Sequence, residues 1–358
     1  MDKIILVVSD IEAGDGSATD DFIADKLFSS FIDSYLARRY NEIPVELVLN
    51  GDTFDFIKSS HDGNYTRYIT EGISLAKVGL FLKAHPIFFN SLKKFLKHKK
   101  NKAIFIYGNH DPDLAFKAVQ KKLADILGGN IMFPGFSYES SAVRAEHGSQ
   151  LDEIFKTNGP TIIRHEGKNI LNLPPITYAV FEHLALLKKV YPLFERIYPK
   201  KQLLKRVPKL ARILMATNTK YFLKAIYKLV KNSKNPTYKV PKGYISRIFS
   251  NIIHHNYESV FGRRVRTALK KMKGVEILII GHWHTPKEMS IKHKKVICTG
   301  TWRDEYFISK HTSMLRSRGK YFAEVIITGD KVIGARLIKH RATNKSSDAR
   351  LLDYLIEK

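Results

Sequence analysis

The fold is decided by one stretch, Ala103-Ile104-Phe105-Ile106-Tyr107-Gly108-Asn109-His110-Asp111-Pro112. Five apolar residues closed by Gly and Pro predict a buried strand that ends in a tight turn. Polar side chains then collect at the carboxyl end of the strand, the edge of an open α/β sheet where ligands bind. Asn109 offers a neutral oxygen, His110 a ring nitrogen or a proton, and Asp111 a carboxylate that can fix the ring. The turn alone is explained equally well as the cap of the next helix.

Three further apolar runs end in the same way. Residues 4–9 lead into Asp10-Ile11-Glu12, residues 45–50 into Gly51-Asp52-Thr53-Phe54-Asp55, and residues 276–280 into Gly281-His282-Trp283-His284. Four strands therefore deliver Asp, Glu, Asn and His to one edge of a sheet. This mixture of side chains is the ligand set of a two-metal hydrolytic site.

Together with His147-Gly148, these motifs resemble those of the calcineurin-like metallophosphoesterases, which read D-x-H, G-D-x-x-D, G-N-H-D, H-G and G-H-x-H. All five blocks stand in the order of the family, between residues 10 and 284. The sequence around Asp10 and the Gly-Asp-Thr-Phe-Asp-Phe form of the second block are most similar to the UDP-2,3-diacylglucosamine hydrolase branch. One residue departs from the pattern, because Glu12 stands where the family has His.

The resemblance implies an α/β fold of the four-layer α+β kind, in which two sheets form a metallophosphoesterase sandwich flanked by helices. It also implies two divalent ions bridged by Asp52, with Asp10, Glu12 and His284 on the first ion and Asn109, His147 and His282 on the second. A hydroxide bridging the two ions is the implied nucleophile. His110, oriented by Asp111, is the implied proton donor or charge stabiliser at the leaving group.

Glu12 changes the expected preference for metals. A carboxylate in place of an imidazole makes the first position harder, which favours Mn²⁺ or Mg²⁺ over Zn²⁺, with Fe also open. Glu12 either binds the first ion or points away from it, in which case that ion is held weakly. The sequence leaves both options open.

Strands and helices are expected to alternate through residues 1–159. A helix is expected to open at Asp20-Asp21-Phe22, and one long helix to run from about residue 66 to residue 98. Strands at residues 276–280, 296–301, 321–327 and 331–338 are expected to complete the second sheet. We therefore predict one core domain from residues 1–159 and 274–340, an inserted helical segment at 160–273, and a polar tail with a short helix at 341–358.

The inserted segment is strongly basic. Residues 151–275 contain 26 Lys and Arg against 6 Asp and Glu, so an excess of 20 out of the net charge of +26 lies there. Lys220, Lys224, Lys228 and Lys231 recur at three- and four-residue spacing, which predicts a basic amphipathic helix. We interpret the segment as a lid whose lysines contact the substrate. The alternative is a surface helix with a solvated lysine face.

The composition limits the compartment and the partners. The charge favours anionic partners, namely a phosphorylated small molecule or lipid, an acidic membrane surface or nucleic acid. The single Cys298 rules out an internal disulfide and fits a reducing compartment. Because the first apolar run ends at Asp10, it predicts a sheet strand and no signal peptide, and no run approaches the roughly 20 apolar residues of a membrane span. We expect a cytoplasmic protein, with peripheral contact at the inner face of the membrane and the oligomeric state left open.

The favoured function is a metal-dependent phosphohydrolase that cleaves a phosphodiester or pyrophosphate in a nucleotide-linked lipid or a similar amphiphile. The basic and apolar insertion suits an anionic head and an apolar tail. One alternative is a phosphodiesterase or nuclease acting on nucleic acid or nucleotides, although the aromatic residues of the insertion form no evident stacking platform. The second alternative is a membrane-surface scaffold with a degenerate metal site, of which Glu12 would be the first sign.

Overall fold

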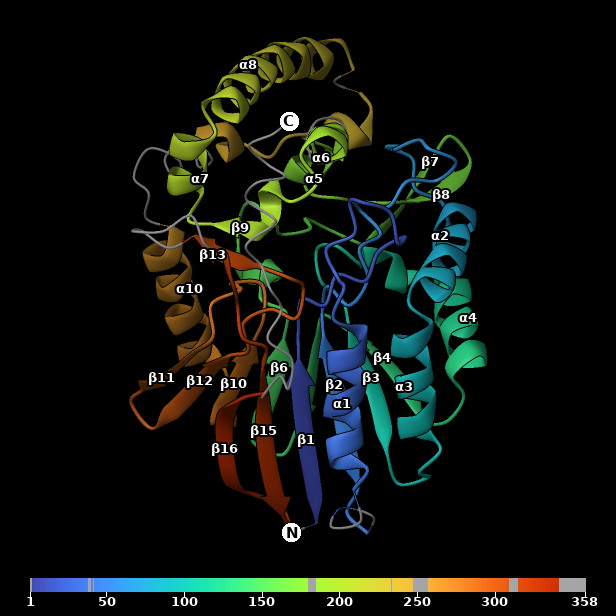
Figure 1. Cartoon of the computed structure of the whole chain (residues 1–358), viewed down its shortest axis with the longest axis vertical. Coiled ribbons are helices and arrows are strands. Elements are labelled where there is room, and N and C mark those ends of the chain that lie inside the picture. The colour runs from blue at the N-terminus through green and yellow to red at the C-terminus, as the bar shows by residue number, and fades with distance from the viewer. Residues whose placement is uncertain are drawn as a thin grey trace.

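Two stacked sheets form the centre of the molecule, and helices cover their outer faces (Figure 1). The computed structural model describes residues 2–37, 40, 42–179, 185–232, 234–246, 257–308 and 315–340. The first sheet has the strand order β16-β15-β1-β2-β3-β4, with the bounds Lys331–Lys339, Tyr321–Thr328, Lys3–Val8, Val45–Asn50, Lys102–Ile106 and Ile131–Gly135. The second has the order β11-β12-β10-β6-β5, with the bounds Lys287–Ile291, Lys294–Cys298, Ile277–Ile280, Val143–Glu146 and Ser137–Ser140.

Smaller elements complete the described chain. A three-stranded sheet joins β14 (Leu315–Ser317), β13 (Tyr306–Ile308) and β9 (Ile197–Tyr198), and a hairpin joins β7 (Ile162–His165) and β8 (Lys168–Leu171). The α-helices are α1 (Asp25–Tyr35), α2 (Glu71–Ala84), α3 (Pro86–Leu96), α4 (Lys117–Leu127), α5 (Pro175–Ala179), α6 (Ala185–Val190), α7 (Lys200–Arg206), α8 (Pro208–Lys231) and α10 (Tyr257–Lys271). Short 3₁₀ helices are Pro112–Ala115, Ser149–Leu151, Phe194–Arg196 and Pro236–Tyr238.

The alternation of side chains along the strands produces the layers. On β1, Leu6 belongs to the core shared with the helices on the outer face of the first sheet, whereas Ile5 and Val7 belong to the core between the sheets. On β10, Ile279 faces the first sheet, and Leu278 faces the core that includes residues of α10. The order is therefore helices, sheet, sheet, helix, and the predicted two-sheet α/β sandwich is confirmed.

Parallel pairing brings the motif-bearing strand ends together. β1, β2 and β3 are parallel neighbours in the first sheet, so they stop at the same edge. In the second sheet β6 and β10 are parallel, and Glu146 pairs with Ile280. The residues after both strands, His147 and Gly281, therefore lie side by side, and the Gly281 amide donates to the His147 carbonyl.

Two of the expected helices are wrong in extent. The helix expected from residue 66 to 98 is broken at Pro86 into α2 and α3, whose axes differ by 92°. Pro86 has no backbone N–H to donate and takes the first position of α3, which ends α2 before it. Residues 20–22 open no helix, because the Asp20 carboxylate accepts from the Gly16 and Phe22 amides and folds a loop.

No helix in the described parts of the chain is long and apolar enough by itself to cross a membrane; α2 and α3 meet that test only when counted together.

The last strands belong to a different sheet than expected. β15 pairs with β1 and β16 pairs with β15, so both extend the first sheet and not the second. The reason is that β15 has buried apolar residues on both faces: Ala323 and Val325 fill the core between the sheets, and Phe322 packs in the helix-covered core. Such a strand is suited to the interior of the sandwich, next to β1.

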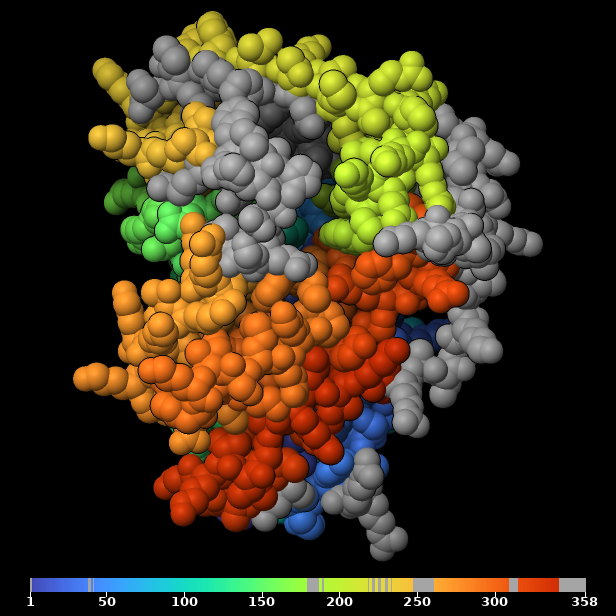
Figure 2. Space-filling model, turned by 90° about the vertical axis from the view of Figure 1, so that its left-hand side faces the viewer, coloured from blue at the N-terminus to red at the C-terminus, as the bar shows by residue number. Residues whose placement is uncertain are grey.

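The inserted segment lies over the sheet edge at which β1, β2 and β3 end (Figure 1). Its first described element is the β7–β8 hairpin, so the segment is not wholly helical as expected. Leu187, Phe194 and Leu210 form a separate apolar core with Tyr306 and Leu315, which come from the chain after the insertion. Figure 2 shows this division: orange and red residues 257–340 form the lower part of one face, and yellow-green and yellow residues from 185 onward form the upper part. The tail expected at 341–358 lies outside the described residues.

His85 links the loop before α1 to the junction of α2 and α3. Its Nε2 lies 2.9 Å from Asp20 and its Nδ1 lies 3.1 Å from Asp25. Burial alone would lower the pKa of His85, but the two carboxylates outweigh it and raise that pKa to about 9. The folded state therefore holds the proton more tightly than the unfolded chain, whose His pKa is about 6.5.

We predict that His85→Gln lowers the free energy of unfolding by about 2 kcal/mol below pH 6.5, and that this deficit shrinks as the pH rises through about 9. Urea unfolding of both proteins at pH 6 and pH 9.5, values chosen to lie roughly on either side of that range, measures the effect. Lys94→Gln, which removes an exposed ion pair with Asp33, is the matched control and should change little at either pH. A deficit that is equal at both pH values would contradict the assignment.

Candidate metal centre

The backbone at the shared sheet edge is strained where the motifs lie. Asp10, Glu12, Asp52, His282 and His284 all have a positive φ, between 48° and 60°. This left-handed conformation is disfavoured for residues other than glycine, at a cost of roughly 1 kcal/mol or more each. Hydrogen bonds hold the turns together, since the Asp10 amide donates to Gly51 O and the Glu12 amide to Asp52 O. Strain of this kind is concentrated at functional sites.

Two glycines of the motifs are required by close approach. A Cβ on Gly108 would lie 2.0 Å from Asp52 Oδ1, and a Cβ on Gly51 would lie 2.5 Å from the Cβ of His147. Gly51 also has a φ of 79°. Glycine is therefore needed at both positions for the loops after β2 and β3 to pack against the site.

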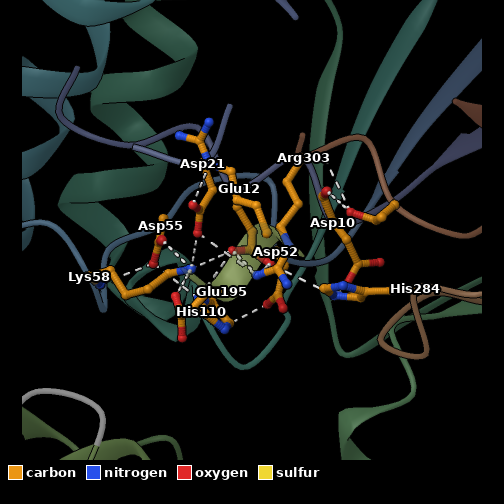
Figure 3. A network of polar contacts seen from close by, with 12 residues as sticks. Asp10, Glu12, Asp21, Asp52, Asp55, Lys58, His110, Glu195, His284 and Arg303 are labelled. Carbon is orange, nitrogen blue, oxygen red and sulfur yellow. Dashed lines mark hydrogen bonds and ion pairs between the residues drawn. The ribbon is translucent and has the colours of Figure 1, made fainter. Parts of the chain in front are cut away.

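Two groups of ligand-type atoms lie next to each other at this edge. Asp10, Glu12 and His284 form the first group, in which His284 Nε2 lies 3.1 Å from Asp10 Oδ1 and 3.8 Å from Glu12 Oε1. Asp10, Asp52 and His147 form the second, in which His147 Nε2 lies 3.1 Å from Asp52 Oδ2 and 4.0 Å from Asp10 Oδ1. Figure 3 shows Asp10, Glu12, Asp52 and His284 converging on one place.

Asp10 is the residue common to these two groups. That Asp52 bridges two ions stays a prediction. Asp52 also approaches Glu12 and His110, with which it forms a further group. Asn109, expected on the second ion, lies against the second group, with its Oδ1 3.1 Å from His147 Nε2.

The donor set fits divalent cations. Asp10 Oδ1 is buried, and within the described residues it accepts no hydrogen bond although two imidazoles face it. His147 donates from Nδ1 to Asn50 O, and His284 Nδ1 lies 2.7 Å from Glu305 Oε1. Both rings are thus fixed through Nδ1 with Nε2 turned to the carboxylates, which is how metal-binding imidazoles are oriented.

The electrostatics of the second group agree with this fit. Burial alone would lower the pKa of His147, but the Asp52 and Asp10 carboxylates raise it to about 10. The negative charge around Nε2 is therefore strong enough to hold a proton on a fully buried ring. A cation at the same place would be stabilised by the same carboxylates.

His282 stands apart from these groups. Its Nε2 lies 3.2 Å from Asp152 Oδ2, and its ring is 5.2 Å from the ring of His147. The His282 amide donates to Asp10 Oδ2, so the residue helps to place a candidate ligand. The structure thus puts His282 beside the second group and outside the sets of atoms close enough to share one ion.

The expected pairing of His110 with Asp111 is wrong. His110 Nδ1 lies 3.0 Å from Asp55 Oδ1, so Asp55 orients the ring. The Asp111 carboxylate instead accepts from the amides of Gly108, Asp52 and Thr53, at 2.6, 3.2 and 2.7 Å. It ties the loop after β3 to the loop after β2, because those amides have no strand partner there.

Sequence reasoning missed several residues that contact the candidate ligands. Lys58 and Arg303 bind Glu12, Glu305 binds His284, and Asp152 binds His282. Asp55 could have been found, because it stands in the Gly-Asp-Thr-Phe-Asp motif. The others carry no spacing or motif signal, since folding alone brings them to the site.

A cavity of about 630 Å³ opens next to the two groups. Its lining includes Glu12, Asp52, Asn109, His110, His282 and His284, the cations Arg303 and Arg318, and the aromatic residues Phe155, Tyr198, Trp283 and Phe307. Among the described residues that line it, none comes from α8, so Lys220, Lys224, Lys228 and Lys231 lie outside the cavity wall. The cavity can take an anionic group next to the candidate ligands with an apolar part against the aromatic rings.

We predict that Asp111→Ala lowers the free energy of unfolding by about 2 kcal/mol or more, because three buried amides lose their acceptor. Thermal and urea unfolding measure the loss. Asp125→Ala, which removes an exposed carboxylate paired with Lys121, is the control and should change stability little. An equally small effect of both substitutions would show that Asp111 does not hold the loops.

Comparisons with known proteins find solved structures but no related sequence family. No family model matches the chain, and no curated protein matches it. A candidate 5′-nucleotidase from Staphylococcus aureus, in complex with α-ketoglutarate, is 14% identical with a TM-score of 0.33; the match covers 99% of this chain, which spans only 58% of that protein. An uncharacterised protein from Streptococcus pneumoniae, described as a predicted phosphoesterase, is 10% identical with a TM-score of 0.26, over 94% of this chain and 97% of the other.

The phosphopantetheinyl hydrolase of Mycobacterium tuberculosis is 12% identical with a TM-score of 0.27, over 88% of this chain and 96% of the other. None of the three is described as a UDP-2,3-diacylglucosamine hydrolase. At these TM-scores the similarity supports no argument about function. The function of the chain must therefore be inferred from the geometry of the two groups of ligand-type side chains and of the cavity beside them.

Proposed function

We propose that the chain is a metal-dependent phosphoester hydrolase of the calcineurin-like type. The observation that carries this proposal is the pair of adjacent groups, Asp10–Glu12–His284 and Asp10–Asp52–His147, beside a cavity with arginines in its wall. When bound there, divalent ions supply Lewis-acid activation of water and neutralise the charge of the phosphoryl group. The motif resemblance, in its five blocks and their order, supports the same chemistry.

The side chains around the groups have distinct tasks in this proposal. His110 lines the cavity, and Asp55 fixes its ring through Nδ1, so the other ring nitrogen is the one proposed to donate a proton to the leaving oxygen. Arg303 and Arg318, which also line the cavity, supply positive charge for the phosphoryl oxygens. Asp10, Asp52, Asn109, His147 and His284 are the proposed metal ligands, and Mn²⁺ is the proposed ion.

We propose further that the substrate is amphiphilic, for example a nucleotide-linked lipid. On α8 the apolar side chains of Met215, Leu223 and Tyr227 are 73%, 63% and 63% exposed, close in sequence to the exposed Lys220 and Lys224. A surface that combines exposed apolar and basic side chains suits an anionic lipid headgroup and its chains. The same surface supports peripheral contact with an anionic membrane, which would bring α8 to the substrate before the cavity receives it.

We predict that hydrolysis of bis-p-nitrophenyl phosphate requires added Mn²⁺ and falls to background in excess chelator. It should also fall to background in Asp52→Ala, because Asp52 belongs to two of the groups of side chains that could hold a metal ion. His110→Ala should lower turnover by about 10²- to 10⁴-fold yet bind Mn²⁺ like the wild type. Steady-state kinetics and metal analysis of the purified proteins separate the two effects. Unchanged turnover in chelator would contradict the metal dependence, and loss of metal in His110→Ala would make His110 a ligand.

We predict that replacing Lys220, Lys224, Lys228 and Lys231 with Gln weakens sedimentation with acidic liposomes, since each basic residue near such a surface contributes about 1 kcal/mol. The ratio of kcat/KM for a UDP-linked lipid to that for the small diester should fall. A control variant, Lys121→Gln and Lys100→Gln, removes exposed lysines far from α8 along the chain. Wild-type protein that ignores liposomes but binds nucleic acid with a steep salt dependence would favour the nuclease alternative.

A further inference from the structure

A buried ammonium group fills a carboxylate cluster next to the candidate metal ligands. Lys58 Nζ lies 2.7 Å from Glu12 Oε2, 2.6 Å from Asp21 Oδ2 and 3.1 Å from Asp55 Oδ2 (Figure 3). The oxygens of these three carboxylates are themselves close enough together to hold a metal ion. Since all four side chains are at most 3% exposed, the cation of the cluster is part of the chain.

A second cation of the chain binds the same glutamate. Arg303 Nη1 lies 3.1 Å from both oxygens of Glu12, and Figure 3 shows Lys58 and Arg303 both pointing toward it. Each oxygen of Glu12 therefore accepts at least one charge-assisted hydrogen bond, which is among the strongest kinds in proteins. Both oxygens of Glu12 are therefore already engaged by buried cations of the chain.

The position of Lys58 is fixed from the other side by the inserted segment. Lys188 Nζ lies 2.7 Å from Asp21 Oδ2, and Arg196 Nε lies 2.9 Å from Asp21 Oδ1. Glu195 lies 3.5 Å from Lys58 and 3.4 Å from Lys188. If a metal ion replaced Lys58 at Glu12, the buried ammonium would either be repelled by the nearby ion or move away and leave Asp21 and Asp55 with one buried cation fewer, and both are unfavourable.

The second group has no such competitor. The described ion pairs of Asp52 and Asp10 involve only His147 and His284, with no Lys or Arg among them. Imidazoles become neutral ligands when a cation binds, whereas the ammonium of Lys58 and the guanidinium of Arg303 keep their charge. The two positions therefore differ in the charge that surrounds them.

We infer that Lys58 and Arg303 hold Glu12 as an ion-pair partner and keep it from coordinating metal, so that the first position binds its ion much more weakly than the second. The inference rests on the proposed metal-dependent function and refines it. In this arrangement the ion at Asp52, His147 and Asn109 is retained, and the ion at Asp10 and His284 exchanges with solution. Arg303, which lines the cavity, supplies fixed positive charge next to the weaker position.

Titration of metal-free wild-type protein with Mn²⁺ tests the inference directly. Calorimetry should show one tight equivalent and a second that binds at least about tenfold more weakly, the size of effect that changes around a metal ligand produce. Electron paramagnetic resonance at one equivalent should show the spectrum of an isolated Mn²⁺ ion. Two equivalents of equal affinity, with an exchange-coupled spectrum from the first addition, would overturn the inference.

Substitutions at Glu12 test whether the weaker binding at the first position arises because Glu12 is not a metal ligand. Glu12→Gln should leave both affinities within about threefold of the wild type, because the side chain is not a ligand, whereas Glu12→His should tighten the weak site by about tenfold or more. His147→Ala is the matched control and should remove the tight equivalent. A large loss of the weak site in Glu12→Gln, with a circular dichroism spectrum and melting curve like the wild type, would make Glu12 a ligand and overturn the inference.

The outcomes separate this inference from the proposed function. Two equal Mn²⁺ ions together with Mn²⁺-dependent diesterase activity would reject only the inequality of the sites. No Mn²⁺ binding and no diesterase activity would reject the proposed function and the inference with it. One tight and one weak ion with activity that rises as the weak site fills would support both.

Discussion

The carboxylates at the ends of β1 and β2 are buried, and a buried carboxylate is stable only beside a cation or hydrogen-bond donors. The arrangement of the site depends on which donors or cations pair with each buried carboxylate. Asp111 is met by backbone amides of two loops, Asp21 by Lys188, Arg196 and Lys58, and Glu12 by Lys58 and Arg303. Asp10 is the exception, because one of its oxygens faces two imidazoles and accepts no hydrogen bond within the described residues. This oxygen lies where the two ligand groups join, between the imidazoles of His147 and His284.

The sequence predicts the sandwich and the place of the site because both depend on local patterns. An apolar run that ends in polar residues marks a parallel strand and its carboxyl end, and β1, β2, β3 and β10 all follow that rule, the last three with a Gly before the polar residues. The sheet to which β15 and β16 belong could not be predicted in this way. Their alternation shows that they are strands, but β15 pairs with β1 through contacts between residues more than 300 positions apart.

The same limit applies to the site. Asp10, Asp52, His147 and His284 converge as the motifs predict, although their role as metal ligands remains a proposal. The choice between the two readings of Glu12 could not be made from the motifs, since it depends on where Arg303 comes to lie. That arginine is 291 residues away in the chain and is brought to Glu12 by the loop after β12. Ion pairs between residues so far apart in the chain leave no periodic pattern in the sequence from which they could be predicted.

The ion pairs between the insertion and the core also bear on the expected role of the insertion as a lid. A lid that merely covers the cavity could move without disturbing the core, but Lys188 is fully buried and, with Arg196, neutralises Asp21 of the core. Removing them would leave a buried carboxylate with less compensation and would free Lys58 to rearrange around Glu12. The first part of the insertion, up to Tyr198, thus belongs to the ion-pair network around Asp21, Lys58 and Glu12.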